Sequence, residues 1–390
     1  MDGQEKKDAF VQWRLLPAYL ILGGVIGWIA GRYLGLTLKE QDGLGMVLFL
    51  LAWLLLCLSL AVFLQVIVHE AGHLIGGLLS GYSFTSLRIG SLLFIKKAGR
   101  IRCRKFTLPG TAGQCLMAPP DRLEDRFPTL LYNVGGCLAN VLFSVAALLA
   151  NMLLEGTPLL PPLLQLTAAM GLFYALLNGI PLRVGPVDND GRNAYQLSRN
   201  EAAARSFWIQ LKINSLTAQD VRLKDMPDEW FRLPQGEEMK NGLCASVGTF
   251  ACCRAMDRLD FEEAGRIADV LLEEAPGLTG LHRQSLVMER MFCELVGENR
   301  ADVVRRLDSE ELWKYGGAAA FNPAVHRLGY AYELLYRRDE AAAAKRLESF
   351  EKAAADYPYE AEVQGERELI ACAKRAYEGQ KRKLLSEATS

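Results

Sequence analysis

Long apolar runs fill the first half of the chain, whereas charged residues are spread through the second half. Between two of these runs, apolar and polar residues alternate on either side of Lys97-Ala98-Gly99, which predicts a β-hairpin at about 84–110. The apolar runs are each long enough to cross the roughly 30 Å hydrocarbon core of a bilayer as a helix, and they lie at about 15–36, 44–80, 129–154 and 159–182. The pattern predicts a mainly α-helical fold, in which a membrane core of about four transmembrane helices carries a β-hairpin insertion.

Residues 241–390 lack long apolar runs and have helical periodicity instead. Two stretches, Phe261–Pro276 and Arg338–Pro358, repeat apolar positions at helical spacing and end at a proline. Both resemble the second helix of a tetratricopeptide repeat, which has a period of about 34 residues. The Trp and Gly-Tyr positions of the first repeat helix are mostly absent. A tetratricopeptide-like array and a plain helical bundle are therefore both open interpretations of this soluble domain.

These patterns divide the chain of 390 residues into parts with different expected roles. The first apolar run is longer than the core of a usual signal peptide, and no small-residue cleavage pattern follows it, so we expect an uncleaved membrane anchor. The expected parts are an N-terminal tail with the first membrane helix at 1–36, a membrane core at 37–194, a linker with one short helix at 195–240, and a helical domain at 241–390.

The distribution of charge predicts how the helices are oriented in the membrane. The loop from Tyr82 to Phe127 is rich in Lys and Arg, whereas the opposite connections hold few charges: Lys39 lies in the first and Glu155 in the second. The positive-inside rule therefore places the hairpin, both termini and the C-terminal domain in the cytosol. The nine cysteines are scattered and form no C-x-x-C pair, which fits reduced thiols in that setting. A net charge of −1 gives no signal for a nucleic acid partner.

The second apolar run contains the strongest chemical signal of the sequence. The motif His69-Glu70-Ala71-Gly72-His73 puts two imidazoles one helical turn apart on one face, which suits a Zn²⁺ ion. Glu70 lies beside them, placed to take a proton from a water molecule on the metal. Ionisable side chains at membrane depth are costly and mark functional sites. We therefore interpret the pair as metal ligands rather than as histidines satisfied within a helix.

A third ligand is expected, because catalytic zinc usually has three protein ligands and one water. Candidates follow the fourth apolar run, where Pro181 and Gly185-Pro186 end the helix. Asp190 and Asp188 both lie in this segment. Taken alone, the segment is equally well explained as an ordinary helix exit turn, since Asn, Asp, Gly and Pro are turn residues.

Together these motifs resemble the site-2 protease family of intramembrane zinc metalloproteases, over roughly residues 44–195. Three motifs carry the resemblance: His69-Glu70-x-x-His73, Gly136-x-x-x-Asn140, and Asn178-x-x-Pro181 followed by Asp190-Gly191. The resemblance implies that His69, His73 and Asp190 bind Zn²⁺ and that Glu70 is the general base. It also implies that Asn140 and Asn178 hold the substrate backbone or the tetrahedral intermediate. Asparagines also commonly join membrane helices, and that interpretation stays open.

The sequence departs from the family pattern at two places. Cys137 stands where the family has a proline in its second motif. Asp190 follows Pro181 by nine positions, four more than in the family, which keeps Asp188 as a competing ligand.

The resemblance implies an intramembrane endopeptidase whose substrate is a membrane-spanning or membrane-associated peptide or protein. Its expected partners are that substrate, the lipid bilayer and a protein partner at the C-terminal helical domain. One alternative is a non-catalytic membrane scaffold that presents a helical-repeat peptide-binding domain, and the complete His-Glu-His-Asp set argues against it. Another is a metal transporter, which we would expect to have more polar groups across its other membrane helices.

Overall fold

The computed structural model describes residues 3–121, 128–154, 159–184 and 187–388. Glu155, the pair Gly185-Pro186 and the end of the basic loop at 122–127 lie outside the described residues.

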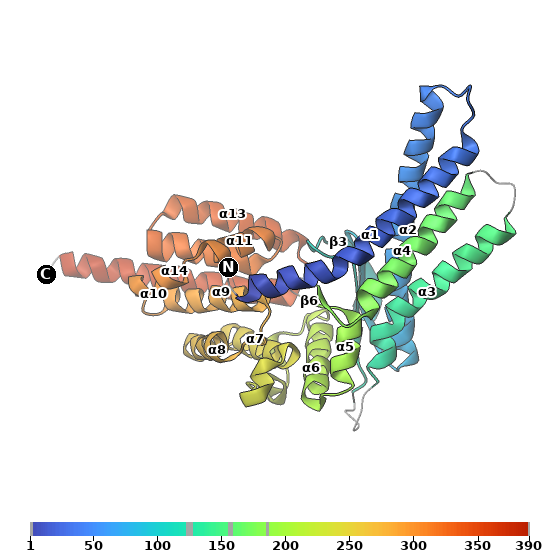
Figure 1. The fold of residues 1–390 in the computed structure, drawn as a ribbon. Coiled ribbons are helices and arrows are strands. Elements are labelled where there is room, and N and C mark those ends of the chain that lie inside the picture. The colour runs from blue at the N-terminus through green and yellow to red at the C-terminus, as the bar shows by residue number, and fades with distance from the viewer. Residues whose placement is uncertain (1–2, 122–127, 155–158, 185–186, 389–390) are drawn as a thin grey trace. The chain divides into compact units, whose positions relative to one another are not determined.

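The described chain is mainly helical, and its N-terminal half contains the four long apolar helices that the sequence predicts (Figure 1). Their bounds are α1 (Gly3–Thr37), α2 (Leu44–Leu79), α3 (Leu130–Leu153) and α4 (Leu160–Gly179). Residues Leu15–Thr37 of α1 and the whole of the other three are long and apolar enough to cross a membrane. The chain therefore has the helices of a multi-pass membrane protein.

Helices α2, α3 and α4 pack against one another, and α1 packs mainly on α4 (Figure 1). Glycines allow the closest approach: a Cβ atom on Gly72 of α2 would collide with the backbone oxygen of Gly135 on α3, and the reverse also holds. Lipid provides no hydrophobic driving force for helix association, so membrane helices depend on close van der Waals packing. Small residues at a crossing allow that packing. Leucines such as Leu55 and Leu142 are exposed on the outer surface, as expected of side chains that face lipid tails.

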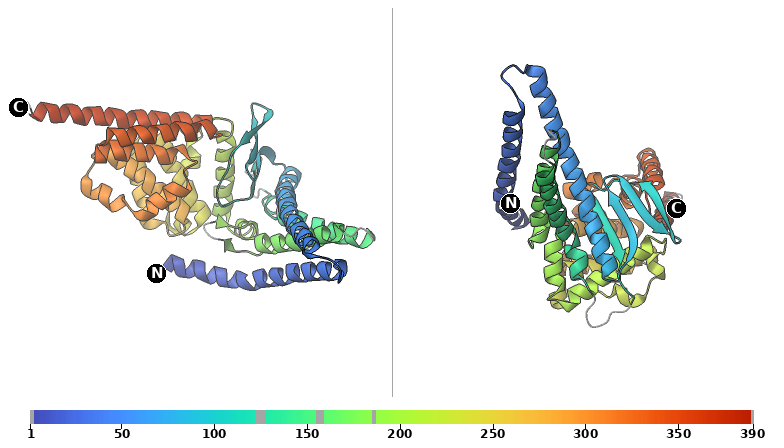
Figure 2. Two further views of the ribbon diagram at one scale, coloured as in Figure 1. Left: turned by 90° about the horizontal axis from the view of Figure 1, so that it is seen from above. Right: turned by 90° about the vertical axis from the view of Figure 1, so that its right-hand side faces the viewer.

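A small antiparallel sheet lies between α2 and α3 in the sequence. Its strands are β1 (Ser83–Ile89), β2 (Leu92–Lys97), β3 (Arg100–Lys105) and β4 (Gly113–Ala118), in the order β3-β2-β1-β4 (Figure 2). The hairpin predicted at about 84–110 covers β1, β2 and β3, and its predicted turn joins β2 to β3. Lys97 pairs with Arg100 across a two-residue turn, in which Ala98 and Gly99 both have positive φ, as a type I′ turn requires. The structure divides the first strand of the predicted hairpin into β1 and β2, and it adds β4.

The chain forms two compact units, which are Met1–Ile89 with Ala112–Arg199, and Gly90–Thr111 with Asn200–Ser390. The β2–β3 hairpin thus belongs to the same unit as the C-terminal helices. The Nζ atom of Lys97 lies 2.8 Å from both carboxylate oxygens of Asp220. The Phe106 ring, which follows β3, packs edge-on against Phe321 and Tyr357. These contacts anchor the hairpin on the helical unit.

The second unit is built almost entirely of helices. Residues 195–240, expected to be a linker, contain the 17-residue helix α6 with buried Trp208 and Ile213, followed by three short 3₁₀ helices. Helices α8 and α13 end just before Pro276 and Pro358, as predicted. The α-helices of this unit are α6 (Glu201–Thr217), α7 (Gly242–Asp257), α8 (Phe261–Glu274), α9 (Gly280–Val296), α10 (Ala301–Leu307), α11 (Glu310–Ala318), α12 (Pro323–Ala331), α13 (Glu340–Asp356) and α14 (Glu360–Ala388).

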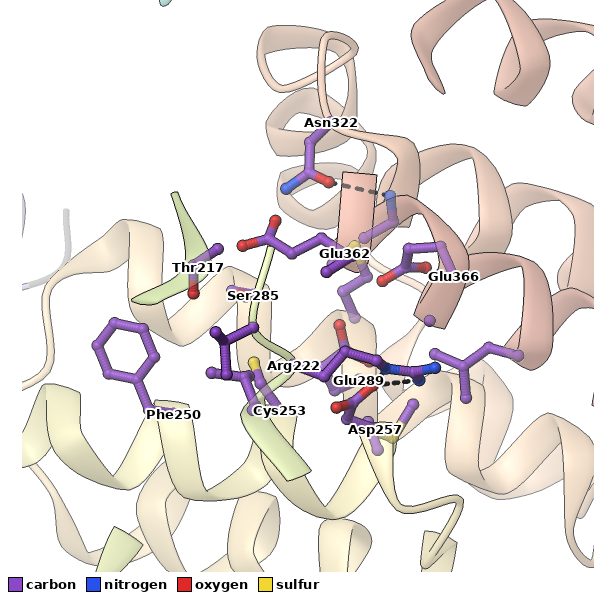
Figure 3. A pocket seen from close by; sticks show the side chains of 18 of the residues that line it. Thr217, Arg222, Phe250, Cys253, Asp257, Ser285, Glu289, Asn322, Glu362 and Glu366 are labelled. Atoms are coloured by element: carbon purple, nitrogen blue, oxygen red, sulfur yellow. Dashed lines mark hydrogen bonds and ion pairs between the residues drawn. The ribbon is translucent and has the colours of Figure 1, made fainter. Parts of the chain in front are cut away.

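This helical unit contains a partly open cavity of about 190 Å³ (Figure 3). Its wall includes Asp257 of α7, Glu289 of α9, and Glu362 and Glu366 of α14. Arg222 also lines the cavity and forms ion pairs with Asp257 and with Glu368. The carboxyl group of Glu362 loses hydration in this wall, which raises its pKa to about 7.

Candidate metal centre

The two histidines of α2 face the interior of the first unit. His69 and His73 are one turn apart, and their Nε2 atoms lie 3.1 Å from each other. Gly136 of α3 lies directly against both rings: a Cβ atom there would come within 2.6 Å of His73 Nε2 and 2.7 Å of His69 Cε1. Glycine at this position therefore leaves room for the imidazoles to meet.

The third candidate ligand arrives on α5 (Asp190–Leu197), after a short pair of strands, β5 (Arg183–Val184) and β6 (Val187–Asp188). Asn189 fixes the start of this helix. Its side-chain amide donates to the carbonyls of Leu177 and Ile180, and its oxygen caps the backbone N–H of Arg192. These bonds tie α5 to the end of α4 and bring the carboxylate of Asp190 to the histidines.

The three candidate ligands converge on one point. Asp190 Oδ2 lies 3.2 Å from His69 Nε2 and 3.4 Å from His73 Nε2. Four ligands at about 2.0–2.1 Å around a tetrahedral zinc ion are separated from one another by about 3.3–3.4 Å, so the observed triangle has the size of one face of such a site. Asp190 Oδ2 is also buried. Among the described residues, this His69–His73–Asp190 group is the one whose donor atoms could hold a metal ion.

The other nitrogen of each imidazole is occupied. His73 Nδ1 lies 2.7 Å from the Tyr132 carbonyl oxygen, and His69 Nδ1 lies 2.7 Å from Asn140 Oδ1. A carbonyl oxygen only accepts, so Nδ1 of His73 donates, and in the neutral imidazole its Nε2 keeps a lone pair for a metal. Outer contacts of this kind orient histidine ligands in metal sites generally. The side chain of Asn140 is fully buried, and leaving such a group unpaired would cost roughly 1–3 kcal/mol.

Glu70 is buried between α2 and the sheet. Its carboxyl group lies against Gly113, the first residue of β4, so closely that a Cβ atom on Gly113 would overlap it. Arg88 of β1 donates from Nη2 to the Gly113 carbonyl over 3.3 Å, which holds the end of β4 in place. The general base expected from the sequence therefore stands where an edge strand begins.

Of the other expected site residues, Asn178 lies in the last turn of α4 and is half-buried. Its side chain donates to the Tyr174 carbonyl of its own helix over 3.1 Å. Asp188 points to a different set of partners from Asp190: its two oxygens lie 3.0 Å from Arg192 Nε and 3.0 Å from Gln196 Nε2. The structure thus brings Asp190 to the histidines and pairs Asp188 within its own segment.

Sequence reasoning did not find Tyr132 and Asn189, and it left Gln65 without a role. The Tyr132 contact is made by a backbone carbonyl, which no residue pattern reveals. Asn189 is a helix cap beside a turn, and that signal is common in any loop. Gln65 could have been found from the sequence, because it is the strongly polar residue of its apolar run and lies four positions before His69.

No protein-family model, curated protein or solved structure matches this chain.

Proposed function

We propose that this protein is an intramembrane zinc metalloendopeptidase that cleaves a membrane-spanning or membrane-associated peptide. The observation that supports it best is the convergence of His69, His73 and Asp190 beside Glu70, at the end of a helix long enough to cross a membrane. Two imidazole nitrogens and one carboxylate oxygen form a ligand set typical of catalytic zinc.

Zinc bound by this set would supply Lewis-acid polarisation of the scissile carbonyl and of a water molecule. Glu70 accepts a proton from that water molecule while the water oxygen attacks the carbonyl carbon of the peptide bond. The same carboxylic acid then gives the proton to the leaving nitrogen as the C–N bond breaks. The products are a new carboxyl terminus and a new amino terminus.

The substrate must be extended before this can happen, because the carbonyls of a helix are engaged in intrahelical hydrogen bonds. Strand β4 offers a template for extension. It is at the end of the strand order, pairs with β1 on one side, and begins at Gly113 against the Glu70 carboxyl group. A substrate segment paired with the other edge of β4 would be held as a strand close to the general base.

The substitution Glu70→Gln tests this function. The protein should be purified in detergent micelles and given a panel of transmembrane peptides with zinc present. We expect wild type to cleave at least one peptide, and Glu70→Gln to retain zinc and to lose cleavage. An equivalent change at the exposed loop residue Glu40, Glu40→Gln, is the matched control and should cleave normally.

Other outcomes would support the alternatives. Zinc binding without cleavage of any peptide would favour a scaffold, and zinc flux into liposomes would favour a transporter. Cleavage by Glu70→Gln at the wild-type rate would exclude the proposed role of Glu70.

A further inference from the structure

Gln65 lies in the membrane helix α2, and the proposed mechanism gives it no task. Its side chain is fully buried, one helical turn before His69 and on the same face. Polar side chains at membrane depth are costly, and those that occur there are paired or functional. The contacts of Gln65 therefore indicate what it contributes.

Gln65 is the middle member of a chain of hydrogen bonds that joins three helices. Its Nε2 donates to the Thr167 carbonyl of α4 over 2.7 Å, and its Oε1 accepts from Asn140 Nδ2 of α3 over 2.7 Å. Asn140 Oδ1 in turn lies 2.7 Å from Nδ1 of His69. The chain runs from the backbone of α4 to a candidate metal ligand.

Two backbone carbonyls set the directions of the bonds in this chain, that of Thr167 at its far end and that of Gln65 beside Asn140. The Thr167 carbonyl can only accept, so the amide of Gln65 must turn its NH₂ group towards it. Its oxygen then faces Asn140, which must donate and must direct its own oxygen at His69. Nδ1 of His69 must therefore carry the proton, which leaves the lone pair of Nε2 for the metal site.

We propose that Gln65 is a positioning residue, which acts through Asn140 to hold His69 in the tautomer that presents Nε2 to the metal. This rests on the proposed metal site and deepens it. The Asn140 amide also donates to the backbone carbonyl of Gln65 over 2.9 Å, so the side chain of Gln65 supplies part of the orientation and the backbone supplies the rest.

A glycine on α4 makes room for this chain. A Cβ atom on Gly171 would collide with both the Gln65 amide nitrogen and the Ser144 hydroxyl group. Gly171→Ala should therefore displace the Gln65 amide, together with the Ser144 hydroxyl group, without removing any polar group from the chain of hydrogen bonds. It is an independent way to break the same chain.

The test uses the full-length protein in micelles with ¹⁵N-labelled histidine. The chain has four histidines, which keeps the spectrum simple, and the ring nitrogen shifts of the metal-free protein report the tautomer of His69. Zinc affinity is measured separately by competition with chelators. The variants are Gln65→Met, which has a similar length and no hydrogen bonds, and Gly171→Ala. Ser59→Ala removes an exposed hydroxyl group from the same helix and is the control.

We expect His69 to be mainly Nδ1–H in wild type and in Ser59→Ala. Gln65→Met should give a mixture with the Nε2–H form and bind zinc about 10-fold more weakly, the lower end of the 10–100-fold typical of outer contacts. Gly171→Ala should shift the tautomer in the same direction. If Gln65→Met loses its helical circular dichroism signal, the result for Gly171→Ala decides the test.

An unchanged tautomer in the folded variants would overturn the proposal, even if zinc affinity fell, because packing alone would then explain the loss. If wild type binds no zinc, the proposed protease function fails. The tautomer of the metal-free protein would still decide the role of Gln65.

Discussion

Asp188 forms an ion pair with Arg192, in which 3.0 Å separates Oδ1 from Nε, while Asp190 directs Oδ2 at the two histidines. Two carboxylates that are only two residues apart thus have different surroundings. The Asn189 cap between them explains the difference, because it ends the extended segment and starts α5.

The first prediction follows from this contrast. Asp190→Ala should weaken zinc binding by more than the roughly 10–100-fold typical of outer contacts, because it removes a ligand atom. Asp188→Ala should retain zinc, since the contacts that it breaks join Asp188 to Arg192 and Gln196 of its own segment and not to the histidines. Zinc retention against a series of chelators measures both. Loss of zinc in Asp188→Ala alone would reassign the third ligand.

A second prediction concerns Gly136. Gly136→Ala should lower zinc affinity strongly, because its Cβ atom would push the rings of His69 and His73 apart. Gly45→Ala, in open space at the start of α2, is the matched control and should bind zinc as wild type does. Equal affinities in the two variants would contradict the geometry of the metal centre.

A third prediction separates the general base from the metal. Gly113→Ala should displace the Glu70 carboxyl group, since a Cβ atom at Gly113 would overlap it. We expect zinc to remain bound and peptide cleavage to fall, whereas Gly136→Ala should lower zinc affinity itself. Cleavage rates and zinc content of one preparation provide both readouts. Normal cleavage by Gly113→Ala would show that Glu70 does not need its place beside β4.

A fourth prediction concerns orientation in the membrane. Single cysteines should be introduced at exposed positions of a cysteine-free protein by Lys96→Cys, Glu298→Cys and Gln41→Cys. The basic loop predicts that the first two are protected from an impermeant reagent added to intact cells and that the third is labelled. The reverse pattern would place the helical unit outside the cytosol.

A fifth prediction uses the cavity of the second unit. The pKa of Glu362 is raised from 4.5 to about 7 by loss of hydration, so the folded protein holds a proton that the unfolded chain has released. Between these values the free energy of unfolding should fall as pH rises, and above pH 7 this loss is complete. Glu362→Gln should therefore stabilise the unit at pH 8 and have much less effect at pH 5.

Hydrogen exchange of α9 and α14 in the intact protein measures this stability. Glu311→Gln, at an exposed residue of α11, is the control and should not change the pH dependence. A Glu362→Gln variant that is less stable than wild type at pH 8 would mean that the charged form of Glu362 is the one the fold needs.

The sequence by itself predicted the features that depend on short-range periodicity. An apolar run of sufficient length predicts a membrane helix wherever it occurs, and the four spans were found in this way. The spacing of His69 and His73 predicts a shared face, because an α-helix turns once in 3.6 residues. Lys97-Ala98-Gly99 predicted the β2–β3 turn, since few residues adopt positive φ easily.

Only the tertiary structure decided which groups meet across elements. The motif alignment left Asp188 and Asp190 open, and the hydrogen bonds of Asn189 to the end of α4 bring Asp190 to the histidines. The roles of Asn140 and Gln65 depend on the close crossing of three helices, and the Tyr132 contact depends on a backbone carbonyl. Such contacts join residues distant in sequence, and no local pattern encodes the packing that brings them within hydrogen-bond distance.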